Sequence, residues 1–301
     1  MLVYLNGRIL PRDQARIDPF DRGFLFGDGL YEGLRAFDGY IVGMDLHVQR
    51  LRDGLAEAKL EWDAGELPGI CRQLLDATGL PDAFVYVHVT RGTPLPGHPV
   101  RARIPAAVTP PTVFGFATAT PGLSAYPPVP TKSAAVLDDR RWLRGRVKSI
   151  SLMGSVLSAA EAHAHGEEDA VLVRETAQGR LAAESTSANL IIVNEQGELV
   201  TPSLEGVPIL AGVTRDLILR AAQQAKLAIS VRDVPEAELR SAREVMLCGT
   251  LTMVTSITRL DGRRVGDGHA GPRAQELLRL LIAEIQREAG VTHLATPLTV
   301  R

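Results

Sequence analysis

The chain has 301 residues, of which 45% are hydrophobic and 5% aromatic, and its formal net charge at pH 7 is −2. This length exceeds one average domain and supplies enough apolar side chains for a sizeable core, so we expect two domains. The charge excludes the general basic surplus of proteins that bind a nucleic-acid backbone or an anionic membrane, and a small-molecule partner is favoured.

We expect a cytoplasmic protein, because no basic N-terminal region precedes a long apolar stretch and no run approaches the length that spans a bilayer. The two cysteines, Cys71 and Cys248, are far apart in the sequence and indicate neither a disulfide framework nor a metal cluster. No bound metal ion is therefore expected.

Turn dipeptides punctuate the first forty residues. Asn6-Gly7 and Asp38-Gly39 supply the positive backbone angles of two-residue turns, so antiparallel hairpins are expected around both. Hydrophobic periodicity then predicts two helices followed by two strands, at 45–60, 64–78, 84–89 and 112–118. Residues 1–118 are therefore predicted to form a small α+β domain.

A proline-rich segment, 119–131, has a composition that resists both helix and sheet interiors, and we expect it to connect two domains. The rest of the chain, 132–301, is predicted to form a larger α+β domain. Its expected strands lie near 133–137, 169–174, 188–194 and 244–249, and its expected helices near 151–165, 212–225 and 272–289.

Lysine is rare, since only Lys59, Lys132, Lys148 and Lys226 occur among 33 basic residues. Arginine can replace lysine where a permanent charge suffices, but not where a neutral amine must react, because guanidinium does not deprotonate in proteins. Lys148 lies in the arginine-rich run 140–149, whose charges favour the neutral amine if the run is partly buried. It is either a nucleophilic, Schiff-base-forming lysine or part of a solvated basic strand edge.

Three further segments carry polar groups in suggestive places. Glu184 lies among small polar residues before an apolar strand, where it could pair with a ring nitrogen or simply belong to a capped loop. A glycine loop at 212–216 leads into a helix, which favours a phosphate seat but also fits an ordinary helix start. Residues 249–252 offer a similar cluster of hydroxyl and amide groups, with the same ambiguity.

The segment 26–35 is a glycine-punctuated loop that runs into a strand. It matches neither a Walker loop nor a dinucleotide fingerprint, because the glycine spacing and the terminal Lys-Ser/Thr are missing. Turn chemistry explains the glycines. It does not explain why Tyr31 and Arg35 project from the same face of one strand.

These motifs follow one another in a fixed order along nearly the whole chain. They are the segments 21–32, 47–51, 89–93, 141–148, 161–163, 184–189, 209–216 and 249–250. The ordered set resembles the fold-type IV enzymes that use pyridoxal 5′-phosphate (PLP), the class IV aminotransferases, and particularly the D-amino-acid (D-alanine) aminotransferases. The resemblance implies a two-domain α+β fold, with PLP bound by the larger domain, and a homodimer with the active site near the subunit interface.

The resemblance also implies roles for matching residues. Lys148 would hold PLP as a Schiff base and move the proton between the substrate Cα and the cofactor C4′. Glu184 would pair with the pyridinium nitrogen and keep it protonated, so that the ring acts as an electron sink. The remaining cofactor contacts would come from a phosphate-binding set and from one residue that packs on the ring: Arg50, Val213, Thr214 and Thr250 for the phosphate, and Leu210 for the ring.

The match to the D-alanine enzymes is incomplete in the substrate pocket. Tyr31 would face the substrate carboxylate. In those enzymes the loop after Val-Thr-Arg-Gly-Thr supplies an arginine and a histidine that bind this carboxylate; here His98 is present, but Pro96 takes the place of the arginine. Arg35 or Arg141 could therefore take over anion binding.

Part of the pocket is similar to the branched-chain aminotransferases instead. The strand 31–37 has their pattern, whereas their later Gly-Thr-Ala-Ala carboxylate turn is Gly249-Thr250-Leu251-Thr252 in this chain. Leu251 and Thr252 are therefore also expected to face the substrate.

The expected activity is transfer of an amino group between an amino acid, of D configuration, and a 2-oxo acid. A branched-chain L-amino-acid aminotransferase and an (R)-amine transaminase are close alternatives with the same core chemistry. A lyase similar to aminodeoxychorismate lyase is a second class, against which the run 141–144 argues. A PLP-free binding protein on the same scaffold is a third, which the presence of both Lys148 and Glu184 disfavours.

Overall fold

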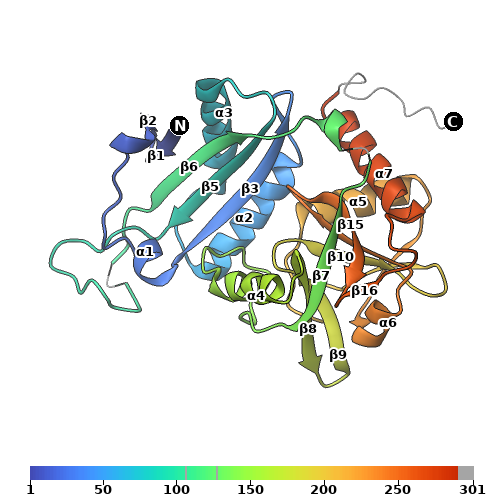
Figure 1. The fold of residues 1–301 in the computed structure, drawn as a ribbon. Coiled ribbons are helices and arrows are strands. Elements are labelled where there is room, and N and C mark those ends of the chain that lie inside the picture. The colour runs from blue at the N-terminus through green and yellow to red at the C-terminus, as the bar shows by residue number, and fades with distance from the viewer. Residues whose placement is uncertain (106, 127, 291–301) are drawn as a thin grey trace. The chain divides into compact units, whose positions relative to one another are not determined.

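The computed structural model describes residues 1–105, 107–126 and 128–290. The chain divides into two compact units (Figure 1): the first unit contains residues 1–122 and 147–152, and the second contains residues 123–146 and the chain from 153 onward. Helices and strands occur in both, so the α+β prediction is confirmed. Residues 291–301, which belong to the predicted larger domain, lie outside the described residues.

The first unit is built on a six-stranded antiparallel sheet with the order β2-β1-β6-β5-β3-β4. Its strands are β1 (Leu2–Leu5), β2 (Arg8–Pro11), β3 (Gly29–Phe37), β4 (Tyr40–Ile41), β5 (Ala83–Thr90) and β6 (Thr112–Ala119). Its helices are α1 (Arg22–Phe26), α2 (Met44–Ala58) and α3 (Leu67–Thr78), with 3₁₀ turns η1 (Arg12–Gln14) and η2 (Ala64–Glu66).

Both predicted hairpins are confirmed. Asn6 and Gly7, with φ of 46° and 86°, connect β1 to β2, and Asp38 and Gly39, with φ of 48° and 75°, connect β3 to β4. These left-handed angles at both central positions match the right-handed twist of the flanking strands. The turns therefore set the register of two strand pairs from local sequence.

One face of this sheet forms the core of the first unit. Helices α2 and α3 pack on it (Figure 1), and the buried valines of β5, Val85, Val87 and Val89, point toward them. The alternate residues of β5, among them Tyr86 and His88, are partly exposed on the opposite face. This period of two is what a strand with one covered face requires.

A short segment from later in the chain lies along the edge of β3. The Tyr31 N–H donates to the Lys148 carbonyl at 3.0 Å, the Ile150 N–H donates to the Gly29 carbonyl at 3.1 Å, and Leu30 pairs with Ser149. These bonds hold Lys148 beside the sheet of the first unit.

The second unit contains a ten-stranded mixed sheet with the order β12-β11-β10-β14-β15-β7-β8-β9-β13, to which β16 is added beside β15. Its strands are β7 (Thr131–Asp138), β8 (Asp169–Thr176), β9 (Gly179–Ser185), β10 (Asn189–Val193), β11 (Leu199–Thr201), β12 (Ile229–Val231), β13 (Val234–Pro235), β14 (Glu244–Gly249), β15 (Met253–Leu260) and β16 (Arg263–Arg264). Its helices are α4 (Met153–Ala164), α5 (Val213–Gln224), α6 (Glu236–Arg240) and α7 (Pro272–Glu288), and η3 (Leu123–Ala125) lies near its start.

The sheet of the second unit is buried on both faces at its centre. Leu190, Ile191 and Ile192 of β10 are each 0% exposed, although they point alternately to opposite faces. Helices α5 and α7 pack against β14 and β15. Every helix and strand predicted between 133 and 289 is present, whereas the strands β9, β11 and β15 were not predicted.

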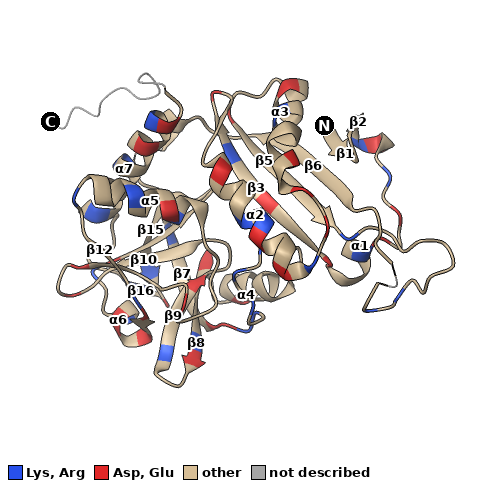
Figure 2. Ribbon diagram, turned by 180° about the vertical axis from the view of Figure 1, so that it is seen from behind, with Lys and Arg blue, Asp and Glu red and all other residues tan. Residues whose placement is uncertain are grey.

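Charged residues of both signs are mixed over each unit (Figure 2). Within the described part of the chain, no helix combines the length and the apolar composition needed to cross a membrane.

Candidate functional site

The amine of Lys148 lies against an aromatic ring of the first unit. Its Nζ is 4.2 Å from the centroid of the Tyr31 ring. The two residues are cross-strand neighbours, because the Tyr31 N–H is bonded to the Lys148 carbonyl, and such neighbours share a face of the sheet. Lys148 is partly exposed, so its amine is both held in place and accessible.

On the opposite face of β3, a buried carboxylate orients Arg50. Glu32 is 0% exposed, and its Oε1 accepts a hydrogen bond of 2.9 Å from Nε of Arg50 while its Oε2 accepts one of 2.5 Å from Nη2. Nδ1 of His47 lies 2.6 Å from the same Oε2. His47 and Arg50 are three residues apart on α2 and therefore share one helix face.

The charges around Glu32 decide its ionisation. Burial alone raises the pKa of Glu32, but the charges of Arg50 and His47 and their hydrogen bonds outweigh it and lower the pKa to about 2. Burial also lowers the pKa of His47, against the opposing effect of Glu32. At neutral pH we therefore describe the group as an anionic Glu32 that accepts from the Arg50 guanidinium and from the ring of His47.

Glu184 is the corresponding buried carboxylate of the second unit. It lies at the end of β9 and is 5% exposed. Its Oε2 accepts hydrogen bonds from the Leu210 N–H at 3.1 Å and from Nδ2 of Asn189 at 3.0 Å, and its Oε1 accepts one from Nη1 of Arg141 at 2.6 Å. Three donors, one of them a cation, stabilise the ionised carboxylate.

Arg141 is fixed by a second carboxylate. Its Nε and Nη2 donate to the two oxygens of Asp139 at 2.9 and 3.0 Å, and Nη2 of Arg174 lies 3.0 Å from the same Asp139. Burial lowers the pKa of Arg141, but the hydrogen bonds and charges of Asp139 and Glu184 prevail and raise it. The guanidinium of this predicted substrate ligand thus bonds with two carboxylates of its own unit.

The loop before α5 connects Glu184 to a helix N-terminus. α5 begins at Val213 after an extended Gly212. The N–H groups of its first turn have no acceptor within the helix, and the N-cap side chain supplies none. A Cβ at Gly212 would come within 1.8 Å of Oδ1 of Asn189, whose Nδ2 donates to both Glu184 and the Leu210 carbonyl. The predicted helix start is confirmed, and its positive end suits an anion.

Arg215 adds a buried cation to the first turn of α5. It is 5% exposed, and it donates from Nε to the Thr201 hydroxyl at 3.1 Å and from Nη2 to the Pro202 carbonyl at 2.9 Å. Burial lowers its pKa. The sequence motif contained this residue, but no role was predicted for it.

The other predicted residues of the second unit lie in one hairpin turn. β14 ends at Gly249 and β15 begins at Met253, and these two residues are paired. Thr250, Leu251 and Thr252 form the turn between them, in which Leu251 is exposed and the Thr252 carbonyl accepts from the Thr255 hydroxyl at 2.9 Å.

Two predicted substrate residues of the first unit, Arg35 and His98, have other partners. Arg35 is four residues along β3 from Tyr31 and is 3% exposed; its guanidinium donates to the Pro121 carbonyl and lies 4.7 Å from the Phe37 ring centroid. His98 is exposed in the loop between β5 and β6, where its N–H donates to the Leu95 carbonyl at 3.1 Å.

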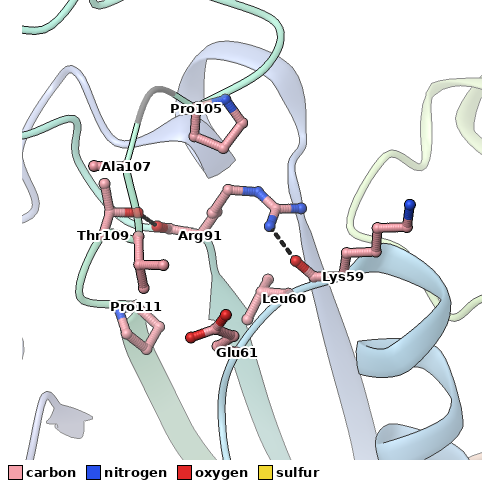
Figure 3. A pocket seen from close by; sticks show the side chains of 9 residues that line it. Lys59, Leu60, Glu61, Arg91, Pro105, Ala107, Thr109 and Pro111 are labelled. Atoms are coloured by element: carbon pink, nitrogen blue, oxygen red, sulfur yellow. Dashed lines mark hydrogen bonds between the residues drawn. The ribbon is translucent and has the colours of Figure 1, made fainter.

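A cavity of about 250 Å³ in the first unit contains none of the predicted site residues (Figure 3). Arg91, one of the two basic residues that line it, donates to the carbonyls of Ala58 and Lys59 and to Asp28. These bonds hold the loop after β5 to the end of α2, so we assign Arg91 a structural role.

The structure thus groups the predicted residues within each unit. Tyr31 and Lys148 share one face of the first sheet, and Leu210 and Arg141 both contact Glu184. No role was predicted for the residues that orient these groups, although three of them lie in the motif segments 21–32, 47–51 and 184–189. They are Glu32, His47, Asp139 and Asn189.

The chain was compared with known proteins. The family model for amino-transferase class IV matches residues 29–260. The D-alanine aminotransferase of Bacillus licheniformis is 32% identical over 294 residues, covering 97% of this chain and 100% of the relative. That of Listeria monocytogenes serotype 1/2a (strain 10403S) is 31% identical, covering 96% and 98%.

Solved structures match over a similar length. A branched-chain aminotransferase from Thermoproteus uzoniensis, determined with norvaline, has a TM-score of 0.81 at 24% identity and covers 96% of this chain and 97% of its own. The branched-chain aminotransferase of Escherichia coli has a TM-score of 0.80 at 22% identity, covering 99% and 97%. At these identities the likeness shows the fold alone, and the predicted fold is confirmed.

Proposed function

The chain belongs to the class IV aminotransferases and is a PLP-dependent transaminase, and we propose that its amino donors are D-amino acids and its acceptors 2-oxo acids. The support is the match to D-alanine aminotransferases at 31–32% identity over nearly the whole chain. The branched-chain aminotransferases, whose structures match at 24% identity or less, define the alternative of L-amino-acid donors.

The polar groups described above fit PLP. The cofactor supplies an aldehyde that bonds with amines and a ring that accepts electrons from the substrate Cα. A partly exposed lysine, Lys148, a buried carboxylate bonded to a guanidinium, Glu184, and an uncapped helix N-terminus at Val213 are the three kinds of group that its aldehyde, ring nitrogen and phosphate require.

We assign Lys148 to the covalent bond with the cofactor and to proton transfer. Its Nζ would take the proton from the substrate Cα and return it at the cofactor carbon. The observation that carries the assignment is the position of this amine, 4.2 Å from the Tyr31 ring and bonded through its backbone to β3. Tyr31 would border the substrate at the same place.

We assign Glu184 to the ring nitrogen and Arg141 to the positioning of Glu184. The Arg141 guanidinium is already bonded to Asp139 and to Oε1 of Glu184, so it stabilises the negative charge that Glu184 needs in order to hold a proton on the ring. Substrate contacts remain proposed for the other pocket residues. They are Tyr31, Arg35, His98, Leu251 and Thr252.

We assign the phosphate to Arg50 and to the N-terminal turn of α5, with Val213 and Thr214, and to Thr250. The helix dipole and free N–H groups favour a dianion there, and the guanidinium of Arg50 is oriented by Glu32. Leu210, whose N–H is bonded to Glu184, would pack on the ring.

A donor screen tests the proposed stereochemistry. D-Alanine, L-leucine and (R)-1-phenylethylamine are each supplied with 2-oxobutyrate as the common acceptor, and kcat/KM is measured. We expect a higher kcat/KM for D-alanine than for L-leucine. The KM for D-alanine should nevertheless be high, because Pro96 stands where the D-alanine enzymes have an arginine that binds the α-carboxylate. Turnover of L-leucine without detectable turnover of D-alanine would reject the D-amino-acid proposal and leave the PLP-dependent transamination intact.

We also propose that the enzyme is a homodimer. Met153, Val156 and Leu157 of α4 are 67%, 57% and 61% exposed and recur at the spacing of one helix face. A second copy of the chain would remove these side chains from water. Light scattering should give twice the monomer mass, and a monomer at micromolar concentration would reject the proposal.

A further inference from the structure

The face of the first sheet that carries Lys148 is a continuous aromatic surface. The strand register places Tyr31 opposite His88, and His88 opposite Phe114. Lys148 lies at the other end of this row, with its Nζ 4.2 Å from the Tyr31 ring centroid. The rings of His88 and Phe114 are 5.2 Å apart. One row across the sheet therefore leads from the reactive amine over three rings.

A second row lies beside the first. Tyr86 stacks on Tyr31 with a centroid separation of 5.4 Å and on Phe116 with one of 5.1 Å. Gly33, which is paired with Tyr86, contributes no side chain, and a Cβ at this position would come within 2.8 Å of the Phe84 ring. The second row thus extends the aromatic surface without a polar interruption.

Tyr86 and His88 of this surface are neutral at pH 7. Burial, with a contribution from Tyr31, raises the pKa of Tyr86 to about 12. Burial lowers the pKa of His88, against the opposing charge of Asp21. Lys148 and Arg35 are cations on the same face, and the guanidinium of Arg35 is buried against Phe37 and the Pro121 carbonyl.

We propose that Tyr86 and His88, with Phe114 and Phe116 behind them in the two rows, form an aromatic wall on which the side chain of the amino donor meets Tyr86 and His88 first, and that the enzyme prefers donors with apolar and above all aromatic side chains. The inference rests on the proposed function, because it takes Lys148 as the reacting lysine. A donor whose Cα is held at Lys148 projects its side chain only a few bonds from that point, and the wall begins beside Lys148 at Tyr31.

The energetics separate donor classes. An aromatic side chain gains offset or edge contacts with the wall, each worth about 0.5–1.5 kcal/mol beyond the area that it buries. A donor with a side-chain carboxylate loses water there and meets neutral rings, so its charge is desolvated without a counter-ion. D-Phenylalanine should therefore be a better donor than D-glutamate.

The test compares donors at constant acceptor. D-Alanine, D-phenylalanine and D-glutamate are each assayed with 2-oxobutyrate, and the same three donors are measured in the L configuration, so that the wall is tested whichever enantiomer reacts. We expect kcat/KM for phenylalanine to exceed that for glutamate at least about tenfold. A glutamate value equal to or above that of phenylalanine would overturn the inference.

A variant pair locates the effect. Tyr86→Ala should lower kcat/KM for phenylalanine about tenfold while changing that for alanine less than about twofold, and Tyr86→Phe should retain both values, since it keeps the ring next to Tyr31. Phe24→Ala removes a ring that is 78% exposed on α1 and should change neither donor. PLP content and alanine turnover report whether each variant is folded.

The outcomes distinguish the two proposals. If the L enantiomers react and the D enantiomers do not, the proposed donor configuration fails, and the comparison of phenylalanine with glutamate still tests the wall. If alanine reacts but phenylalanine does not, or if Tyr86→Ala reduces both donors equally with normal PLP content, the aromatic wall is rejected and the donor configuration is unaffected.

Discussion

Each unit of this chain contains a buried glutamate that is bonded to an arginine, and the two clusters differ in which of these two partners is fixed by further bonds. Glu32 receives its bonds from Arg50 and His47, which lie on the same helix. Glu184 is bonded to a backbone N–H and to Asn189, and its arginine is itself bonded to Asp139. In the first cluster the carboxylate orients a guanidinium, and in the second a guanidinium orients a carboxylate.

The two arrangements suit different functions. An arginine oriented by a buried glutamate is suited to bind an anion, so loss of Glu32 should affect cofactor affinity. A glutamate oriented by a fixed arginine is suited to hold a proton on a base, so loss of Glu184 should affect turnover. The predictions below separate these two effects.

The largest effect is expected for Lys148→Ala, because both clusters are proposed to serve a reaction that takes place at this amine. Without the amine neither the covalent bond to PLP nor the proton transfer is possible, and transamination should fall below detection. The matched control is Lys132→Ala, which removes a partly exposed lysine 3.7 Å from Asp169. Steady-state rates with D-alanine measure both variants, and residual turnover above about one per cent in Lys148→Ala would contradict the assignment.

Acid should weaken the first cluster through Glu32. Its pKa is about 2 in the folded chain and usually 4.5, so the unfolded chain binds the proton first as the pH falls. The stabilisation is complete above pH 4.5 and is lost toward pH 2, and the difference between 4.5 and about 2 corresponds to about 3 kcal/mol of unfolding free energy. His47, whose pKa is lowered from 6.5, acts in the same direction but begins at higher pH.

Urea unfolding of PLP-free wild-type protein and Glu32→Gln between pH 6 and pH 3 measures this effect. The stability gap between the two proteins should narrow steadily below pH 4.5. A gap that stays constant over the whole range would show that the ionised Glu32 does not stabilise the fold.

Glu184→Gln should lower kcat by about one to two decades while PLP content stays near that of the wild type. The neutral amide loses a charge-assisted hydrogen bond worth about 1.5–3 kcal/mol, which is felt when the ring accepts electrons. Rates at saturating donor and the PLP absorbance of the same samples give the two quantities. Unchanged kcat would remove Glu184 from the reaction.

Glu32→Gln should show the opposite pattern, with PLP bound about tenfold more weakly and kcat at saturating PLP nearly unchanged. The neutral amide would leave Arg50 less firmly oriented, and one weakened charged hydrogen bond corresponds to about a decade in affinity. Asp45→Asn, which changes a carboxylate in the first turn of α2, is the matched control and should leave the affinity unchanged. Equal PLP affinity in wild type and Glu32→Gln would contradict a role of Glu32 in cofactor binding.

Features encoded locally could be predicted from the sequence. The two hairpin turns carry their own backbone angles, and the helices α2, α3, α5 and α7 show the apolar period of their buried faces. Glu184 and the glycine before α5 were located because small polar residues next to an apolar strand or helix are visible in a single segment.

Features that depend on distant pairing could not be predicted. Lys148 reaches Tyr31 only because residues 148–150 pair with the edge of β3, more than a hundred residues earlier. Arg141, which is bonded to Asp139, contacts Glu184 because β7, β8 and β9 are neighbours in the sheet. The sequence does not reveal this order, because the small residues of β9 gave no strand prediction. The adjacent pair Asp138-Asp139 before Arg140-Arg141 was the available signal, but local charge does not say which partner is chosen.

The assignment of Lys148 is tested most directly by locating the cofactor. PLP-loaded protein is reduced with borohydride and digested, and the labelled peptide is sequenced by mass spectrometry. If Lys148 holds the cofactor, a single label lies on Lys148 and is absent from Lys148→Ala. A label on Lys59, Lys132 or Lys226 in the wild-type protein would contradict this assignment.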